Sequence, residues 1–308
     1  MGKFKNMVSR SVKKGDLGKK IFCSFLIATG YSNMSLQALE IRHKKYVQIK
    51  KKYSKYLNKI NYPAPEYERG EKNTNIWICW FQGLENAPEM VKTCVNSIYE
   101  HMQGYNITLI TQENLFDYVS LPQYIIDKWK KGIITNTHLS DIVRTELLIK
   151  YGGLWMDATT YLTAPVPEYV FNSKFFLFSS GCKNDITIIY NSWFIYAEQD
   201  NRVLMAVRDL LYKYWEKRKK LNEYFLWHIF VTMVYQRWQD DFKNMPYIMD
   251  EITLHLSRCM LFEFNEEHFK AIKEITPIHK LSYKYVLPED TTGTYYEYIL
   301  NHAQKDGN

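Results

Sequence analysis

One stretch of the chain concentrates acidic and basic residues at spacings that could bind a polar ligand: SDIVRTELLIKYGGLWMDATT. Asp141 and Arg144 are three residues apart, so one turn of a helix would place both on the same face. Gly152 and Gly153 then break the helix, because glycine readily takes the left-handed conformation found at helix C-termini. The apolar strand LWM follows and leads directly into Asp157. In open α/β sheets, ligands bind at the carboxyl ends of the strands.

This order of elements predicts a crevice lined by one guanidinium and two carboxylates. Such groups suit a ligand rich in hydroxyls and phosphates, and a divalent cation could join them. The alternative is structural, with Asp141 and Arg144 as a surface pair and Asp157 as a cap. We favour the functional interpretation, because a carboxylate at the end of a nearly continuous apolar strand is rarely idle.

The surrounding pattern indicates an α/β fold. A buried strand at 75–80, an amphipathic helix at 88–101 and a strand at 105–111 form a βαβ opening, which is typical of a doubly wound nucleotide-binding sheet. The sequence contains neither G-x-G-x-x-G nor a P-loop motif, so a dinucleotide-binding fold and a P-loop kinase are not supported. Further strands are expected at 175–179 and 187–196, and further helices at 112–131, 138–150, 202–219, 223–239 and 266–275.

The N-terminal part differs from the rest in composition. Helices are expected at 17–29 and 34–60, and the segment 61–73, which contains prolines and a glycine, is expected to be a linker. We therefore predict a basic helical N-terminal segment with its linker over residues 1–73. A catalytic domain would follow over residues 74–308.

Positive charge is concentrated in the same region. Residues 1–60 contain 15 Lys and Arg against 2 Asp and Glu, whereas the whole chain contains 40 against 33. The excess is either a solvated helix face or an attraction to an anionic membrane surface or lipid pyrophosphate, at roughly 1 kcal/mol per well-placed cation. Nucleic acid is not an expected partner, because the rest of the chain is acidic and no basic-aromatic reader motif occurs.

Other sequence features bear on the compartment. The apolar run at 21–28 is far shorter than the roughly 20 residues of a spanning helix, and no convincing cleavage site follows it. The five cysteines are scattered and form no C-x-x-C pair, as expected of reduced thiols. We expect a cytoplasmic protein, with peripheral attachment to the inner face of the plasma membrane as an open alternative.

The order of SD-x-x-R helix, double glycine and aspartate-ended strand resembles the "DxD" region of sugar transferases. It is most similar to glycosyltransferase family 32, in its capsular polysaccharide synthesis branch, and the large clostridial toxin glucosyltransferases share the order. The resemblance covers roughly residues 75–285 and is strongest at 136–160. The chain departs from DxD in reading Asp157-Ala158-Thr159, so a neutral hydroxyl replaces the second carboxylate.

The resemblance implies a glycosyltransferase A-type, Rossmann-like sheet with helical additions at both ends. It also implies a retaining hexosyltransferase that uses a nucleotide-sugar donor, with UDP-sugar the favoured type. The acceptor would be a lipid-linked or free oligosaccharide in capsule or exopolysaccharide synthesis. Asp157 and Thr159, with His279 as a third ligand, would hold Mn²⁺ or Mg²⁺ weakly and only with the donor present.

The resemblance also assigns substrate contacts. Asp141 and Arg144 would hold sugar hydroxyls and phosphate oxygens, and Lys280 would face the diphosphate. Trp80 would stack on the nucleotide base, and the other expected contacts are Gln82, Gly83 and Gly153. Asn191 would stabilise charge at the sugar carbon, with Trp193 under the acceptor. Some of these assignments have a structural alternative: Trp80 could be a core residue, and His279 and Lys280 could be a loop histidine and a solvated lysine.

Two other functional classes remain open at this stage. The missing second carboxylate would suit a non-catalytic protein that binds a sugar nucleotide or polysaccharide on a degenerate transferase fold. A nucleotidyltransferase could use the same sheet, but no glycine-rich basic loop follows the first strand.

Overall fold

The computed structural model describes residues 36–64, 72–180 and 185–305. The helix predicted at 17–29 lies outside these ranges, as do Cys23, Cys182 and part of the predicted linker.

A five-stranded mixed sheet forms the centre of the fold, with the strand order β2-β1-β3-β6-β5. Strands β2, β1 and β3 are parallel, and β6 is antiparallel to its two neighbours. The strands are β1 Asn75–Cys79, β2 Asn106–Ile110, β3 Gly153–Met156, β5 Phe175–Ser179 and β6 Tyr190–Ala197. Every residue of β3 and β5 is buried, as expected for continuous apolar strands inside an α/β fold. The predicted α/β class and its βαβ opening are confirmed.

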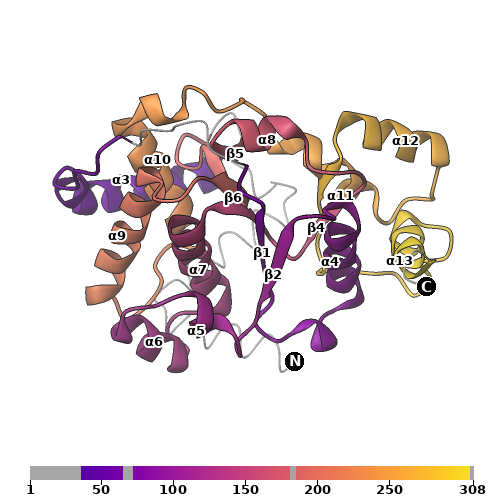
Figure 1. Ribbon diagram of the computed structural model, residues 1–308, viewed down its shortest axis with the longest axis horizontal. Coiled ribbons are helices and arrows are strands. Elements are labelled where there is room, and N and C mark those ends of the chain that lie inside the picture. The colour runs from indigo at the N-terminus through magenta and orange to yellow at the C-terminus, as the bar shows by residue number, and fades with distance from the viewer. Residues whose placement is uncertain (1–35, 65–71, 181–184, 306–308) are drawn as a thin grey trace.

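Helices cover both sides of this sheet (Figure 1). On one side lie α7 (Asn136–Tyr151), α9 (Arg202–Lys217) and α10 (Leu226–Arg237). On the other side lie α4 (Glu89–His101), α11 (His255–Cys259), α12 (Glu266–Ile275) and α13 (Tyr295–Lys305). The remaining short helices are η1 Leu84–Asn86, α5 Leu115–Tyr118, α6 Gln123–Lys130, α8 Glu168–Asn172, η2 Gln239–Phe242 and η3 Asp250–Leu254.

Two predicted elements begin later than expected, and local side-chain hydrogen bonds explain both. β6 starts at Tyr190 because Asp185 Oδ1 accepts from the Thr187 N–H at 3.0 Å and holds those residues in a turn. α10 starts at Leu226 because the Glu223 carboxylate accepts from the Phe225 N–H at 3.3 Å. Acidic side chains at such positions compete with the regular backbone ladder.

The strand order creates an edge of the kind at which open α/β sheets bind ligands. From β1 the chain crosses to β2 on one side and then returns to β3 on the other. The order therefore reverses between β1 and β3, and the carboxyl ends of strands at such a switch point face a crevice. Trp80 follows the end of β1, and Asp157 follows the end of β3.

A second, two-stranded sheet was not predicted. β4 (Thr160–Leu162) pairs antiparallel with β7 (Ile278–Lys280), and Thr160 is the register partner of Lys280. Three residues are too few to show an alternating pattern, so neither strand stands out in the sequence. The pairing ties the residues after Asp157 to a segment more than a hundred positions later.

Helix α3 (Leu36–Leu57) confirms the helix predicted at 34–60. Its apolar face belongs to the main core, where Tyr46, Tyr53 and Leu57 are buried against α9 and α10. Arg237 of α10 donates to the Leu57 carbonyl and, at 2.8 Å, to the carbonyl of Ile60. Removing α3 would therefore expose core side chains. The predicted division at residue 73 stays a proposal about the organisation of the chain.

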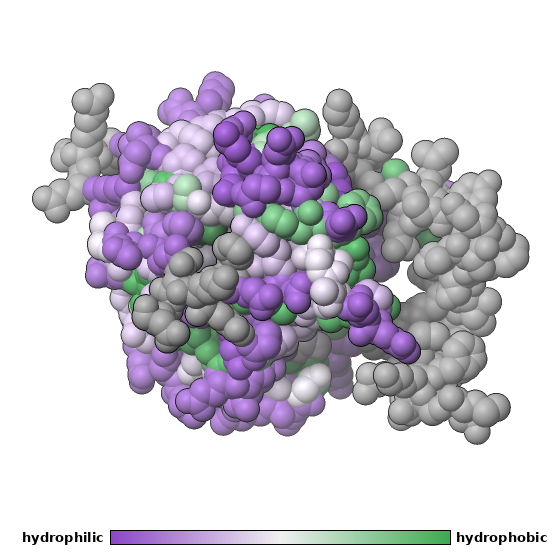
Figure 2. Space-filling model, turned by 90° about the vertical axis from the view of Figure 1, so that its right-hand side faces the viewer, coloured by the Kyte–Doolittle hydropathy of each residue, from purple (hydrophilic) through white to green (hydrophobic). Residues whose placement is uncertain are grey.

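None of the helices in the described ranges is both long and apolar enough to cross a membrane. The side of the molecule that carries the C-terminal helices is mostly hydrophilic, with smaller hydrophobic areas between (Figure 2).

Candidate active site

A cavity of about 270 Å³ opens at the carboxyl ends of β1 and β3. Its walls come from the ends of these strands, the start of α7, the segment before α10 and the segment at β7. The predicted site residues that the structure brings together here are Trp80, Gln82, Arg144, Asp157, Thr159 and Lys280.

Asp157 is the centre of the polar contacts in the cavity. Its backbone N–H donates to the Trp193 carbonyl at 2.8 Å, which fixes the end of β3 against β6. Oδ1 accepts from Trp155 Nε1 at 3.1 Å and lies 3.3 Å from Arg144 Nη1, and Oδ2 accepts from Lys280 Nζ at 2.9 Å. Burial alone would raise the pKa of Asp157, but Lys280 and Arg144 outweigh it and hold that pKa below its usual value. The carboxylate is therefore ionised at neutral pH.

Arg144 bridges the two carboxylates that the sequence singled out. It is only 4% exposed, and its guanidinium lies 3.4 Å from Asp141 Oδ1 and 3.3 Å from Asp157 Oδ1. It also donates to the Ser140 carbonyl at 3.2 Å, to the Ser140 hydroxyl at 3.1 Å and to the Ser192 carbonyl. A guanidinium has five donors in a fixed plane, and here three hydrogen bonds and two ion pairs are arranged around it.

Asp141 lies behind Arg144 and is not among the cavity-lining residues, which corrects the expected contact with donor hydroxyls. His138 Nδ1 is 3.4 Å from Asp141 Oδ2, and Trp215 Nε1 donates to His138 Nε2 at 2.9 Å. Because Trp215 Nε1 can only donate, His138 Nε2 accepts, and Nδ1 is the ring nitrogen that faces Asp141. A buried chain from Trp215 through His138 and Asp141 thus supports Arg144.

Lys280 reaches the cavity from the end of β7. Its Nζ lies 2.7 Å from Thr159 Oγ1 and 2.9 Å from Asp157 Oδ2, and 5.5 Å from the ring centre of Trp193. The pairing of β4 with β7 fixes this position, because Leu281 N also donates to the Thr159 carbonyl at 2.9 Å.

His279 points away from the cavity, which corrects the predicted set of metal ligands. Successive side chains of a strand point to opposite faces, so β7 cannot present both His279 and Lys280 to Asp157. The imidazole is fully buried, and its Nε2 lies 3.1 Å from Thr163 Oγ1. Burial, together with nearby His255, lowers the pKa of His279 to about 3, so the ring is neutral.

Trp80 forms an aromatic wall of the cavity. Its ring meets Tyr283 edge to face, with the ring centres 5.3 Å apart, and its buried Nε1 has no hydrogen-bond partner within the described part of the chain. Gln82 also lines the cavity, whereas Gly83, although next in sequence, does not. Gly83 has a φ of 74°, so it is needed for the turn after β1.

The residues predicted around the reacting carbon are placed differently. Asn191 donates to Asp250 Oδ2 at 2.7 Å and does not line the cavity. Trp193 is buried and stacks on Phe178 with ring centres 5.0 Å apart, so it supports Lys280 from below and does not form an acceptor floor.

Gly153 has a structural role and is not at the ligand-binding edge. It begins β3, at the end of the strand opposite Asp157, and has a φ of 98°. A Cβ added there would lie 2.3 Å from the Asn75 carbonyl oxygen, so only glycine lets β3 approach β1 so closely. This placement corrects the expected substrate contact.

Several cavity residues were missed in the sequence. Asn136, Thr137 and Ser140 precede Arg144 at helical spacings, and that periodicity could have indicated them. Tyr224, Tyr283 and Lys284 lie in irregular segments, where no periodic signal marks which side chains face a ligand.

The residues at Asp157 do not fit a resident divalent cation. Mg²⁺ and Mn²⁺ prefer several oxygen ligands with negative charge among them. Here one carboxylate and one hydroxyl converge, and both hydrogen-bond to an ammonium. Within residues 36–64, 72–180 and 185–305, no group of three or more His, Cys, Asp or Glu side chains could hold a metal ion.

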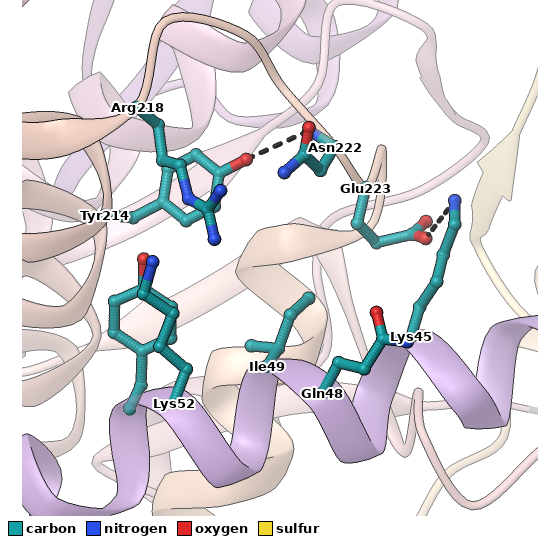
Figure 3. Close-up of a pocket in the computed structure, with 9 residues that line it drawn as sticks. Lys45, Gln48, Ile49, Lys52, Tyr214, Arg218, Asn222 and Glu223 are labelled. Carbon is teal, nitrogen blue, oxygen red and sulfur yellow. Dashed lines mark hydrogen bonds and ion pairs between the residues drawn. The ribbon is translucent and has the colours of Figure 1, made fainter. Parts of the chain in front are cut away.

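A second cavity, of about 80 Å³, lies between α3 and the segment after α9 (Figure 3). Lys45 pairs with Glu223 at 2.8 Å, and Lys52 and Arg218 reach in from opposite sides. Its volume is less than a third of that of the Asp157 cavity, which is itself close to the lower end of the roughly 300–1,000 Å³ of typical small-molecule sites. The cavity at Asp157 is therefore the better candidate.

Comparison with known proteins identifies the family of the chain. A family model described as "Capsular polysaccharide synthesis protein" matches residues 30–299. The chain belongs to this capsular polysaccharide synthesis protein family. The match includes every residue of the Asp157 cavity, and the resemblance stated from the sequence is confirmed.

Individual relatives of this family member are distant. The O-glycosyltransferase braB of Annulohypoxylon truncatum is 22% identical over 211 residues, which are 61% of this chain and 50% of that protein. The chain thus spans about half the length of the curated relative it matches.

Among solved structures, the PaToxG glycosyltransferase has a TM-score of 0.37 and 14% identity, over 65% of this chain and 79% of that one. Two structures of the glycosyltransferase GlyE of Streptococcus pneumoniae TIGR4 have TM-scores of 0.41 and 0.43 and identities of 11% and 10%. Both cover 76% of this chain and 60% of GlyE.

Proposed function

We propose that this member of the capsular polysaccharide synthesis family is a retaining glycosyltransferase. It moves a hexosyl group from a nucleotide-diphosphate sugar, with a UDP-sugar favoured, to a saccharide hydroxyl in capsule or exopolysaccharide synthesis. One observation carries the proposal. At the switch point of the sheet, Arg144, Asp157 and Lys280 form one contact network beside an aromatic wall.

The donor would be bound by two different walls. The nucleotide base would stack on Trp80, a contact worth roughly 1–3 kcal/mol in other proteins. The diphosphate would face Lys280 and Lys284, which both line the cavity. Charge-assisted hydrogen bonds of this kind are stronger than neutral ones, and they strengthen as the diphosphate leaves.

The cavity favours attack without a covalent enzyme intermediate. Asp157 is the only carboxylate among its described lining residues, and both of its oxygens are engaged by cations. Burial raises the pKa of Cys79 far above its usual range, so this thiol is not an anionic nucleophile. The acceptor hydroxyl would therefore attack from the face of the departing phosphate, which takes up its proton.

Mn²⁺ or Mg²⁺, expected from the sequence, is not part of this proposal, because the residues at Asp157 do not fit it. The proposal needs only groups that the chain itself brings into the cavity.

A screen of purified protein with UDP- and GDP-sugars tests the function directly. We expect slow release of UDP or GDP from one donor, and faster release when a saccharide acceptor is added. Donor binding in calorimetry without turnover under any acceptor condition would instead identify a binding protein. Neither binding nor turnover of any sugar nucleotide would refute the proposal.

The acceptor would be a free or lipid-linked oligosaccharide at the cytoplasmic face of an anionic membrane, where basic residues could hold the enzyme. Lys51, Lys55 and Lys59 are exposed on or just after α3, while its apolar face is in the core. A docked enzyme would meet a lipid-linked acceptor at a raised effective concentration.

We predict that the protein co-sediments with vesicles containing anionic lipid and is released by moderate salt, because screening at physiological ionic strength acts over about 8 Å. Changing Lys51, Lys55 and Lys59 to glutamine should weaken this binding without unfolding the protein. The matched control changes Lys130, Lys131 and Lys270, which are also exposed. Equal binding to neutral vesicles, or equal loss in both triple variants, would contradict a specific role of the N-terminal lysines.

A further inference from the structure

The ammonium of Lys280 lies where a sugar transferase with two acidic residues would hold a metal ion. Nζ is 2.9 Å from Asp157 Oδ2 and 2.7 Å from Thr159 Oγ1, the two side chains that a DxD-type site would direct at a cation. We propose that Lys280 acts as a built-in cation that replaces the divalent metal ion, so that glycosyl transfer is independent of metal. This inference rests on the proposed function and concerns the same site.

The charges of the two arrangements are equivalent. Two carboxylates with a divalent cation have no net charge, and neither does one carboxylate with one ammonium. Replacing the second carboxylate by Thr159 removes one negative charge, and Lys280 supplies one positive charge in place of two. The departure from DxD and the position of Lys280 thus compensate each other.

The fold places Lys280 firmly at this position. β4 begins directly after Thr159, and its pairing with β7 sets Lys280 opposite Thr160. The Lys280 side chain is 20% exposed, and it lines the cavity. An ammonium has three N–H donors, and Asp157 and Thr159 accept from two of them, which leaves one for a phosphate oxygen.

Binding of a divalent cation at the same place is disfavoured. To reach Asp157 it would have to displace Lys280 from Oδ2, and Arg144 lies 3.3 Å from the other carboxylate oxygen. The ion would then share Asp157 with Lys280 and Arg144, so that three cations would lie around one carboxylate, and Asp141 would offset only part of the charge of Arg144. Such repulsion disfavours binding of a further cation.

The chemical role follows from the electron flow of the transfer. The bond between the anomeric carbon and the diphosphate oxygen breaks, and both electrons go to that oxygen. The acceptor oxygen bonds to the anomeric carbon, and its proton passes to the phosphate. Lys280 takes no part in this proton transfer and stabilises the growing negative charge by a hydrogen bond and by its positive charge.

Two measurements on the wild-type full chain test the inference. First, turnover of the donor found in the screen is measured with excess chelator and with added Mn²⁺. We expect rates within about twofold of each other. Second, Mn²⁺ binding is followed by electron paramagnetic resonance, with and without the nucleotide diphosphate. We expect no protein-dependent binding below millimolar Mn²⁺. Loss of turnover in chelator that Mn²⁺ restores would overturn the inference, and so would tight Mn²⁺ binding that Asp157→Asn abolishes.

Variants then distinguish the effect of the Lys280 charge from that of the neighbouring residues. Lys280→Met should lower turnover by roughly 10²–10³-fold, the usual cost of removing one group that stabilises transition-state charge. The double variant Thr159→Asp with Lys280→Met restores two carboxylates and removes the ammonium, so it should bind Mn²⁺ and depend on it for turnover. Lys270→Met, an exposed change on α12, is the matched control and should retain wild-type rates.

Failure of this inference can be told apart from failure of the proposed function. If wild type turns over no sugar nucleotide with or without Mn²⁺, the proposed function fails, and the Mn²⁺ titration alone decides whether Lys280 occupies a cation site. If Lys280→Met does not fold, the wild-type chelator and Mn²⁺ measurements still decide. Full activity of a folded Lys280→Met protein in chelator would also overturn the inference.

Discussion

Changing Asp157 to asparagine is expected to reduce donor turnover by roughly 10²–10³-fold while the protein stays folded. The amide keeps the shape of the side chain but loses the charge that Lys280 and Arg144 contact at 2.9 and 3.3 Å. Without that charge, the ammonium is no longer held toward the diphosphate. The measurement is the initial rate of UDP or GDP release, together with circular dichroism and thermal unfolding to verify the fold.

The control for this prediction is Asp240→Asn. Asp240 is an exposed aspartate that pairs with Lys243 of the same turn, with its side chain 79% exposed. Its change should leave the rate within the scatter of the assay. A folded Asp157→Asn protein that works within a few-fold of wild type would show that the site has been assigned to the wrong residue.

Changing Arg144 to alanine is expected to have the largest effect on stability. Arg144 is buried between Asp141 and Asp157 and also donates to the Ser192 carbonyl. Its removal leaves two carboxylates without their shared cation, and breaking a buried pair in this way typically costs about 3–5 kcal/mol. The free energy of unfolding in urea measures the loss, and donor affinity by calorimetry should fall with it.

Arg144→Lys should recover only part of this stability. A single ammonium lacks the planar fork with which the guanidinium reaches both carboxylates and the carbonyl together. Arg258→Ala is the matched control, because Arg258 pairs with Glu251 at the surface with its side chain 57% exposed. Exposed pairs are worth about 0–1 kcal/mol. An Arg144→Ala protein as stable as the control would contradict the central place of Arg144.

The sequence predicted well those features that depend on short-range patterns. The helix with Asp141 and Arg144 on one face, the break at Gly152 and the aspartate after β3 all follow from neighbouring residues. The βαβ opening is equally local, because each element is long enough to show its hydrophobic period. These features suffice to place Asp157 at a ligand-binding edge and to indicate the family.

The tertiary structure decided which groups surround Asp157. Lys280 and His279 are adjacent in sequence, and only the register of β7 against β4 determines that Lys280 faces the cavity and His279 the core. Three-residue strands have no readable period, and their pairing spans more than a hundred positions.

The sequence also could not predict which charged groups are buried. Asp141 reads as a ligand contact, but packing of α7 against the sheet and α9 places it behind Arg144. In the same way, α3 reads as a basic surface helix, yet its tyrosines complete the core. The residue types thus determined that the chain could form a charged site suited to a sugar nucleotide. Long-range packing determined which cation Asp157 holds, because contacts between distant segments leave no local pattern in the chain.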